Sequence, residues 1–377
     1  MPRTLDSKFH IDNIVDQYGA DLDADKVKAY CSNHEVGYQT ITKYLNQFKT
    51  KRGHWKVTVK EAKRQLEKTL ENSNVGIAKT TVQAENLVPA KDDTFIKFGA
   101  FPDLKKVIAS RLFYPVFITG MSGNGKTFGV EQACNQTNRE LIRVNITVET
   151  DEDDLIGGFR LVNGETVWHN GPVIEALERG AILLLDEVDL ASNKILCLQS
   201  ILEGKGVFLK KIGEYIKPSA GFNIIATANT KGKGSDDGRF IGTNVLNEAF
   251  LERFPITIEQ DYPSVVTETK ILTKVSESLN IPMIGEHKKF IEHLCNWADI
   301  VRRTFNEGGV DEIISTRRLT HIIRAYSIFG NKMKSVQMCL NRFDDETKES
   351  FIQLYSKLDE TVNVTESTQK VDRRTLP

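Results

Sequence analysis

The chain is 377 residues long, 40% hydrophobic and 27% charged, and its formal net charge is −1. This length is too great for one ordinary domain, so we expect two or three. The balanced charge excludes a protein that is basic overall, and any contact with nucleic acid must therefore come from a local patch.

The five cysteines are scattered along the chain and form no C-x-x-C pair. This pattern argues against a disulfide framework and against a zinc site. No apolar run reaches membrane-spanning length, and the polar first residues do not resemble a signal peptide. We therefore expect a cytoplasmic protein with reduced thiols and no membrane contact.

Residues 1–71 are predicted to form a small helical domain. Asp23 can cap a helix over about 24–31. A turn follows, and apolar residues at helical spacing predict a second helix within 38–48. A further helix is predicted over about 59–70. The first two helices and the short turn between them resemble a helix-turn-helix.

A basic stretch with aromatic residues follows the second helix. It comprises Lys49, Lys51, Arg52, His54, Trp55 and Lys56. Such residues can neutralise phosphates, which would make the domain a reader of DNA. The alternative is a solvated basic face on a domain that docks a substrate or a partner protein, since helical hairpins with a few lysines are common. Residues 72–94 are polar and small, and they are predicted to be a linker.

Residues 95–262 alternate apolar runs with helical segments, which is typical of an α/β domain with a parallel sheet. Its expected strands lack strict alternation, as strands covered on both faces should. They are 114–119, 141–146, 182–185 and 222–228. Residues 263–360 are predicted to be helical. The expected helices are 266–279, 287–303, 316–329, 332–340 and 345–358. Residues 361–377 are polar, and we expect a flexible tail.

The stretch from Gly120 to Thr127 matches the phosphate-binding pattern G-x-x-x-x-G-K-[ST]. A predicted strand precedes it and a predicted helix over 126–134 follows it, which is the context that this motif requires. Backbone N–H groups of such a loop turn towards the β-phosphate of a nucleotide. Lys126 would reach the β- and γ-phosphates, and the Thr127 hydroxyl would ligate Mg²⁺. The predicted nucleotide-binding residues of the loop are Gly120, Gly123, Asn124, Gly125, Lys126 and Thr127.

Two carboxylates, Asp186 and Glu187, follow a run of four apolar residues further along the chain. At the carboxyl end of a buried strand, Asp186 would join the Mg²⁺ shell. Glu187 would polarise a water molecule for in-line attack on the γ-phosphate. The predicted strand over 222–228 leads into Asn229, whose amide can orient the attacking water or hold the γ-phosphate.

The order of these motifs resembles an AAA+ ATPase, and more narrowly the MoxR/CobS group. This group is related to the ATPase subunits of metal chelatases and is also encoded by tailed phages. Residues 242–254 are similar to the group's pattern G-T-x-x-L-P-E-A-x-L-D-R-F, with Asn247 in place of proline and Glu252 in place of aspartate. The resemblance implies a P-loop α/β core with a parallel sheet, a C-terminal helical lid and a small N-terminal helical domain. It also implies that ATP is hydrolysed to ADP and phosphate with Mg²⁺ as cofactor.

By the same resemblance, Arg253 would be an arginine finger that reaches the ATP of a neighbouring subunit and neutralises charge on the transferring phosphoryl group. Arg317 matches the arginine of the group's lid motif S-P-R and would contact the γ-phosphate, and its neighbour Arg318 is a second candidate. Two predicted hairpins, one turning at 163–164 and one over 206–217, are similar to inserts of this clade. The first would grip a substrate inside a ring, or it would be purely structural.

The resemblance implies a homo-oligomeric ring, a hexamer in AAA+ relatives, that remodels or assembles a partner protein. In the nearest family the partner carries a von Willebrand factor A domain, and in the chelatase branch the pair helps to insert cobalt into a corrin ring. No residue pattern here is typical of binding cobalt or a tetrapyrrole, which favours chaperone-like remodelling. The alternative is a ring NTPase that acts on nucleic acid, similar to the McrB motor, with the N-terminal domain as DNA reader. A scaffold that binds ATP without hydrolysis is a third hypothesis, which the intact Asp186–Glu187 pair argues against.

Overall fold

The computed structural model describes residues 13–15, 17–18, 21–34, 37–56, 86–234, 242–283 and 285–359. The chain divides into two compact units: residues 1–78 with 165–167, and residues 79–164 with 168–377. Among the described residues, no helix combines the length and the apolar character that crossing a bilayer requires.

Among its described residues, the N-terminal unit combines helices with a small antiparallel sheet, and residues 13–15 and 17–18 are also helical. The helices are α2 (Ala24–Asn33) and α3 (Tyr38–Leu45), with a 3₁₀ turn η1 (Asn46–Phe48) after them. The strands are β1 (Asp21–Asp23), β2 (Lys49–Lys51) and β3 (His54–Lys56), in the order β1-β3-β2. Apolar side chains from both layers, including Leu22, Tyr30 and Trp55, form one buried core. The domain is therefore mixed rather than purely helical.

Both helices that the sequence predicted in this described region are confirmed. Asp23 caps α2, because its Oδ1 accepts a hydrogen bond of 2.9 Å from the backbone N of Lys26. The three strands were missed because each has only three residues, too few to show an alternating pattern. Trp55 pairs with Leu22 in the sheet and is only 4% exposed, so it does not lie on the surface with the neighbouring lysines. The helix predicted over 59–70 lies outside the described residues.

A parallel sheet forms the centre of the second unit. Its strands are β4 (Val116–Thr119), β5 (Leu141–Asn145), β8 (Ile182–Asp186), β11 (Asn223–Ala228) and β12 (Ile256–Glu259). Within the described residues the sheet has 5 strands in the order β12-β4-β11-β8-β5, and all its pairs are parallel. The four strands predicted from apolar runs are confirmed. The edge strand β12 was missed because its residues alternate between half-buried and exposed.

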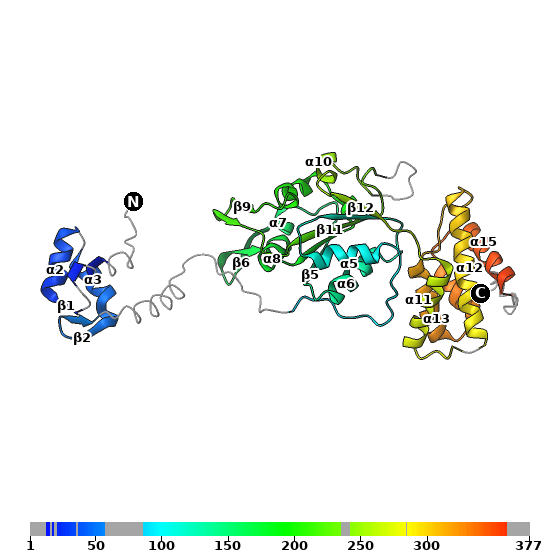
Figure 1. Cartoon of the computed structure of the whole chain (residues 1–377), viewed down its shortest axis with the longest axis horizontal. Coiled ribbons are helices and arrows are strands. Elements are labelled where there is room, and N and C mark those ends of the chain that lie inside the picture. The colour runs from blue at the N-terminus through cyan, green and yellow to red at the C-terminus, as the bar shows by residue number, and fades with distance from the viewer. Residues whose placement is uncertain are drawn as a thin grey trace, which may run out of the picture. The chain divides into compact units, whose positions relative to one another are not determined.

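Helices cover both faces of this sheet. Successive residues of a strand point to opposite faces, so β4 contributes to two cores. Val116 and Ile118 pack with α5 (Phe101–Ser110) and α6 (Lys126–Gln136), which lie side by side (Figure 1). Phe117 instead joins the core on the other face, which includes α8 (Pro172–Arg179). The short elements of this unit are α7 (Glu152–Leu155), η2 (Val188–Leu190), η3 (Asn193–Leu198), α9 (Gln199–Leu202) and α10 (Glu248–Leu251).

Both predicted hairpins are confirmed. The first pairs β6 (Gly157–Val162) with β7 (Glu165–Asn170), and the second pairs β9 (Val207–Leu209) with β10 (Glu214–Ile216). The first turn needs two residues with positive φ, and Asn163 (52°) and Gly164 (85°) supply them.

The C-terminal part of this unit is helical, and it is called the lid below. Its helices are α11 (Val265–Ser278), α12 (Glu286–Asn306), α13 (Thr316–Phe329), α14 (Lys332–Leu340) and α15 (Asp345–Leu358). All the predicted helices of the lid are confirmed, the last three to the residue. Each of those three begins at a side-chain cap, provided by Ser315, Asn331 and Asp344.

Residues 86–94 differ from the predicted linker. The backbone N of Asp92 donates to Gln132 Oε1 at 3.0 Å, and Gln132 Nε2 donates to the carbonyl of Ala90 at 3.0 Å. Asn135 Nδ2 donates to the carbonyl of Pro89 at 2.9 Å. Side chains of α6 thus satisfy three backbone groups of this segment and hold it on the α/β core. The rest of the predicted linker lies outside the described residues.

Candidate nucleotide site

The carboxyl ends of β4, β8 and β11 meet at one edge of the sheet, where ligands of open α/β sheets bind. Segments that follow these strands, together with the lid, enclose a pocket of about 310 Å³. Residues 123–127, Asp186, Glu187, Asn229 and Arg317 all line it. The structure therefore brings together most of the residues that the sequence singled out.

The P-loop has glycines where the backbone approaches other segments closely. Gly120 has a φ of 146°, and a Cβ on it would lie 2.1 Å from the carbonyl oxygen of Gln260. Gly123 has a φ of 73°, and a Cβ there would lie 2.8 Å from Ser315 Oγ at the start of the lid helix α13. Only glycine fits both positions. Gly120 lies outside the set of described residues that line the pocket, but its carbonyl accepts a hydrogen bond from Lys126.

Lys126 lies at the start of α6 and is only 7% exposed. Its ammonium donates to the carbonyls of Gly120 at 2.6 Å and Met121 at 3.1 Å, and to Asn229 Oδ1 at 3.1 Å. Burial lowers its pKa to about 8, although the carboxylates of Asp189, Asp186 and Glu187 oppose this shift. An anionic phosphate in the pocket would compensate this partly desolvated cation.

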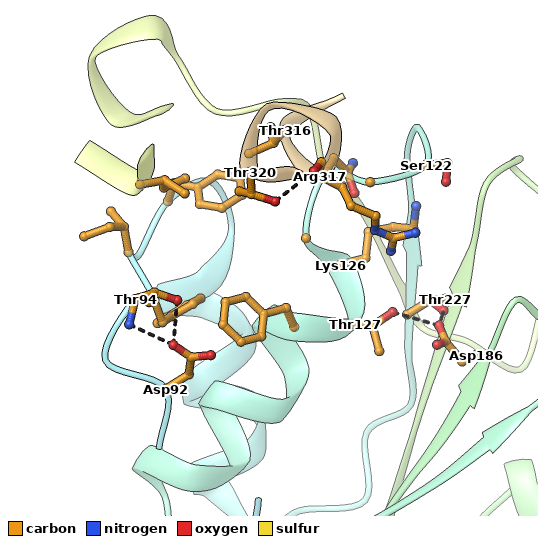
Figure 2. Close-up of a pocket in the computed structure, with 18 of the residues that line it drawn as sticks. Asp92, Thr94, Ser122, Lys126, Thr127, Asp186, Thr227, Thr316, Arg317 and Thr320 are labelled. Atoms are coloured by element: carbon orange, nitrogen blue, oxygen red, sulfur yellow. Dashed lines mark hydrogen bonds between the residues drawn. The ribbon is translucent and has the colours of Figure 1, made fainter. Parts of the chain in front are cut away.

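Asp186 and Thr127 provide oxygen atoms suited to Mg²⁺. Thr127 Oγ1 donates to Asp186 Oδ1 at 2.9 Å, and Thr227 Oγ1 donates to the same oxygen (Figure 2). The other carboxylate oxygen, Oδ2, lies 2.6 Å from Arg143 Nη2. A hydroxyl and a carboxylate side by side match the hard oxygen ligands that Mg²⁺ takes beside substrate phosphates. The residues present thus fit the ion.

Glu187 differs sharply from its neighbour Asp186, which is buried. Glu187 is exposed to the pocket and has a φ of 59°, in the left-handed region that residues other than glycine rarely adopt. Its backbone N donates to Thr227 Oγ1 at 3.2 Å. Such a conformation costs about 1–3 kcal/mol and persists where the surrounding structure holds it. Here it turns the chain so that one carboxylate stays in the sheet and the next faces the pocket.

The two lid arginines have different surroundings. The Arg317 and Lys126 side chains point toward one another from α13 and α6 (Figure 2), and the backbone N of Arg317 donates to the carbonyl of Gly123 at 3.1 Å. Arg318 instead donates to the carbonyl of Cys339, and its guanidinium lies 4.4 Å from the ring centroid of Phe343. The geometry favours Arg317 over Arg318 as the lid residue that faces a nucleotide.

A second connection between the P-loop and the lid was not visible in the sequence. Tyr262 Oη donates to the carbonyl of Ser122 at 2.7 Å, and the Arg302 guanidinium lies 4.1 Å from the centroid of the Tyr262 ring. Arg302 also forms two hydrogen bonds, 3.0 and 2.8 Å long, with the fully buried carboxylate of Glu268. A displacement of α11 or α12 would therefore be transmitted to the P-loop.

Arg253 lies outside the set of described residues that line the pocket. It follows α10, and its Nε and Nη2 lie 3.1 and 2.7 Å from Glu203 Oε1, while Nη1 donates to the carbonyl of Ala249. The structure of one chain thus separates this predicted site residue from the others.

Apolar side chains form another part of the pocket lining. It comprises Phe95, Ile96, Phe98, Ile271 and Val275. Such a surface suits the face of a purine base. These residues were missed because three of them come from an irregular segment without periodicity and two from one face of a lid helix. Arg143 and Thr227 were missed because only the folded sheet brings them to Asp186.

Comparison with known proteins agrees with this geometry. The model of the AAA domain (dynein-related subfamily) matches residues 115–254. An uncharacterised protein of Staphylococcus epidermidis is 27% identical over 246 residues, which cover 63% of this chain and 87% of that protein. The aerobic cobaltochelatase subunit CobS of Sinorhizobium sp. is 26% identical over 222 residues, which cover 57% of this chain and 66% of CobS.

Among solved structures, the Thermotoga maritima RuvB Holliday junction branch migration motor aligns with a TM-score of 0.43 and 18% identity. The alignment covers 68% of this chain and 73% of that chain, and it is too distant to bear on function. The family match and the relationship to CobS agree with the predicted fold and resemblance. Residues 115–254 thus match the AAA domain of the dynein-related subfamily, and the chain is similar to CobS, as the resemblance to the MoxR/CobS group implied.

Proposed function

We propose that this protein is a Mg²⁺-dependent ATPase whose site lies between the α/β core and the lid. One arrangement carries the proposal. Thr127 forms a hydrogen bond of 2.9 Å with Asp186, and Lys126 forms one of 3.1 Å with Asn229. The exposed Glu187 carboxylate lines the same pocket. Phosphate ligands, metal ligands and a general base are thereby combined as phosphoryl transfer requires.

Each residue has a distinct part in this mechanism. Thr127 and Asp186 would hold Mg²⁺, which neutralises charge on the phosphate oxygens when it is bound. Lys126 and Arg317 bring positive charge to the phosphates from two sides. Glu187 accepts a proton from the attacking water, and Asn229 orients that water or the γ-phosphate.

We extend the proposal to a homo-oligomeric ring, hexameric as in other AAA+ proteins, in which Arg253 serves the site of the next subunit. Support comes from its position after α10, where it contacts Glu203 and lies outside the described lining of its own pocket. The Arg253 and Glu203 side chains are 25% and 35% exposed, so the pair is worth little and can open easily.

The function of such a ring would be to remodel or assemble a partner protein, for which a von Willebrand factor A domain protein is the candidate. The relationship to a cobaltochelatase subunit supports this class of action. Nucleic acid is the alternative target. Exposed cations on the β2–β3 hairpin favour this alternative. They are Lys49, Lys51, Arg52 and Lys56. Because Trp55 is buried, this hairpin would contact phosphates without stacking on bases.

The test of the ATPase proposal is phosphate release by the full chain as a function of Mg²⁺. Glu187→Gln should bind nucleotide as the wild type does and lose about 10²-fold or more of its turnover. Lys126→Ala should lose binding. Glu149→Gln removes an exposed carboxylate that lies outside the pocket lining and should change neither. Full turnover in Glu187→Gln would refute the proposed role of this residue.

The partner is identified by affinity capture with the Glu187→Gln form in ATP, which should retain what the ring holds. For the nucleic-acid alternative, duplex DNA should stimulate hydrolysis with a steep salt dependence. The double variant Lys51→Ala/Arg52→Ala should then abolish the stimulation, whereas Lys28→Ala on α2 should not. An unchanged rate with DNA would remove this alternative.

A further inference from the structure

Asp189 was not among the predicted site residues, yet it is the centre of a hydrogen-bonded cluster behind the pocket. It lies in the turn η2, two residues after Glu187, and its side chain is fully buried. Its Oδ2 accepts hydrogen bonds from the backbone N of Asn229 at 2.8 Å and the backbone N of Thr230 at 3.0 Å. Thr230 Oγ1 donates to the same oxygen at 3.2 Å. One carboxylate oxygen therefore fixes the chain at the end of β11.

The residue held in this way is the one whose amide meets Lys126. Asn229 Oδ1 accepts from Lys126 Nζ at 3.1 Å, and Asp189 itself lies outside the set of described residues that line the pocket. Asp189 can therefore influence a nucleotide only through Asn229 and through its charge. Among the carboxylates near Lys126, its charge acts most strongly to raise the pKa of that ammonium.

The same turn also anchors the segment that leads to Arg253. The backbone N of Asn244 donates to the carbonyl of Asp189 at 2.7 Å. Asn244 Nδ2 donates to the carbonyls of Leu190 and Ala191 at 3.1 and 3.2 Å. This segment continues into Asn247, the N-cap of α10, after which Arg253 follows. Asp189 thus lies between the end of β11 and the segment that would complete a neighbour's site.

Burial of the Asp189 carboxylate costs folding free energy. Asp189 Oδ1 is buried and has no hydrogen-bond partner among the described residues, so the group is only half satisfied. A buried charge without full pairing costs several kcal/mol, and a neutral side chain could cap the same turn at lower cost.

We propose that Asp189 is a positioning residue for ATP hydrolysis: it holds Asn229 against Lys126 so that the amide is aligned for the attacking water. The inference rests on the ATPase function proposed above. It predicts that Asp189 acts through Asn229 and that its removal impairs turnover more than nucleotide binding.

The test compares kcat, KM and nucleotide affinity for Asp189→Ala, Asp189→Asn, Asn229→Ala and the double variant Asp189→Ala/Asn229→Ala. Asp189→Ala should lower kcat about 10²-fold, as loss of one aligned polar group does, with KM and affinity within about threefold of wild type. Asp189→Asn keeps an acceptor oxygen and should recover most of the rate. Because both residues act as one unit, the double variant should be no slower than Asn229→Ala alone.

Several outcomes would overturn the inference. They are a wild-type kcat in Asp189→Ala, losses that multiply in the double variant, and an Asp189→Asn variant as slow as Asp189→Ala. A fall in affinity and melting temperature that accounts for the loss of rate would show a merely structural role. If Asp189→Ala does not fold, Asp189→Ser replaces it with the same expectations. A wild-type protein without ATPase activity would refute the proposed function as well, whereas an active wild type with an unimpaired Asp189→Ala would refute only this inference.

Discussion

Arg143 and Asp186 form an ion pair in which Nη2 lies 2.6 Å from Oδ2, while Oδ1 of the same carboxylate accepts from Thr127. Arg143 lies on β5, and its Nη1 also contacts Glu131 at 3.3 Å. The carboxylate that would serve Mg²⁺ is thus shared with a cation of the protein. A guanidinium this close repels a divalent ion at the same group, so Arg143 should weaken Mg²⁺ binding.

The first prediction concerns this competition. Arg143→Ala removes the repulsion and should lower the Mg²⁺ concentration that half-saturates nucleotide binding by about tenfold, because a unit charge about 5 Å from a divalent ion contributes about 1–2 kcal/mol even at the dielectric constant of water. Fluorescent-nucleotide binding at a series of Mg²⁺ concentrations measures it. Arg143→Lys keeps the charge and should stay near wild type. A higher Mg²⁺ requirement in Arg143→Ala would contradict the prediction and indicate that Arg143 orients Asp186 instead.

The second prediction follows from Lys126, whose pKa is lowered by burial from 10.5 to about 8. Between these values the folded chain has released the proton that the unfolded chain still holds. The contribution of this group to the free energy of unfolding therefore rises with pH across that window, since the unfolded state binds more protons. Anionic phosphates favour the charged ammonium, so nucleotide binding at pH 9 should take up a proton that binding at pH 7 does not.

Calorimetric titration in two buffers of different ionisation enthalpy measures this proton uptake. At pH 9 the observed heat should depend on the buffer, and at pH 7 this contribution should vanish. Lys126→Arg is the control, because a guanidinium stays charged across the whole range and takes up no proton. Equal proton uptake at pH 7 and pH 9 would show that the lysine is charged before nucleotide binds.

The third prediction distinguishes the contribution of Arg253 to the stability of its own chain from its contribution to turnover at the site of a neighbouring subunit. Because its pairing with Glu203 is partly exposed, Arg253→Ala should change the free energy of unfolding by less than about 1 kcal/mol. In the assembled protein the same change should lower turnover about 10³-fold, as loss of an arginine finger does. Urea titration and phosphate release measure the two effects. Wild-type turnover in an assembled Arg253→Ala protein would argue that this arginine serves no neighbouring site.

The features that could be predicted from sequence are local. The P-loop, the Asp186–Glu187 pair and the capped helices of the lid each depend on a few consecutive residues, so their patterns identify them. The three inner strands, β4, β8 and β11, were predictable because burial on both faces makes them continuous apolar runs. The edge strand β12 and the three-residue strands of the N-terminal unit carry no such run.

The features that escaped prediction depend on contacts between distant segments. Nothing near Asp186 in the sequence indicates Arg143, and nothing near Ser122 indicates Tyr262. Spacing places Arg317 and Arg318 equally well, and only the folded structure distinguishes them: Arg317 lines the pocket, whereas Arg318 packs against Phe343. The position of Arg253 relative to a neighbouring site stays a prediction, because one chain contains only half of such an interface.

The last prediction concerns the link between Tyr262 and the lid. Tyr262→Phe removes the hydrogen bond to the Ser122 carbonyl but keeps the ring under Arg302, so it should cost only about 1 kcal/mol of stability. Glu268→Gln leaves Arg302 buried without a charged partner and should cost about 3–5 kcal/mol. The two changes therefore affect the same link to very different degrees.

Hydrogen exchange measures how strongly the contacts of Tyr262 couple the P-loop to the lid. In Tyr262→Phe, ATP should protect the lid helices less than in wild type while the sheet is unchanged, because the P-loop no longer holds the lid through this bond. Tyr355→Phe is the matched control, since Tyr355 Oη donates within the lid to Asp359 at 2.9 Å. Equal ATP-induced protection of the lid in wild type and Tyr262→Phe would mean that the lid follows the nucleotide through Arg317 and the backbone contact with Gly123 instead.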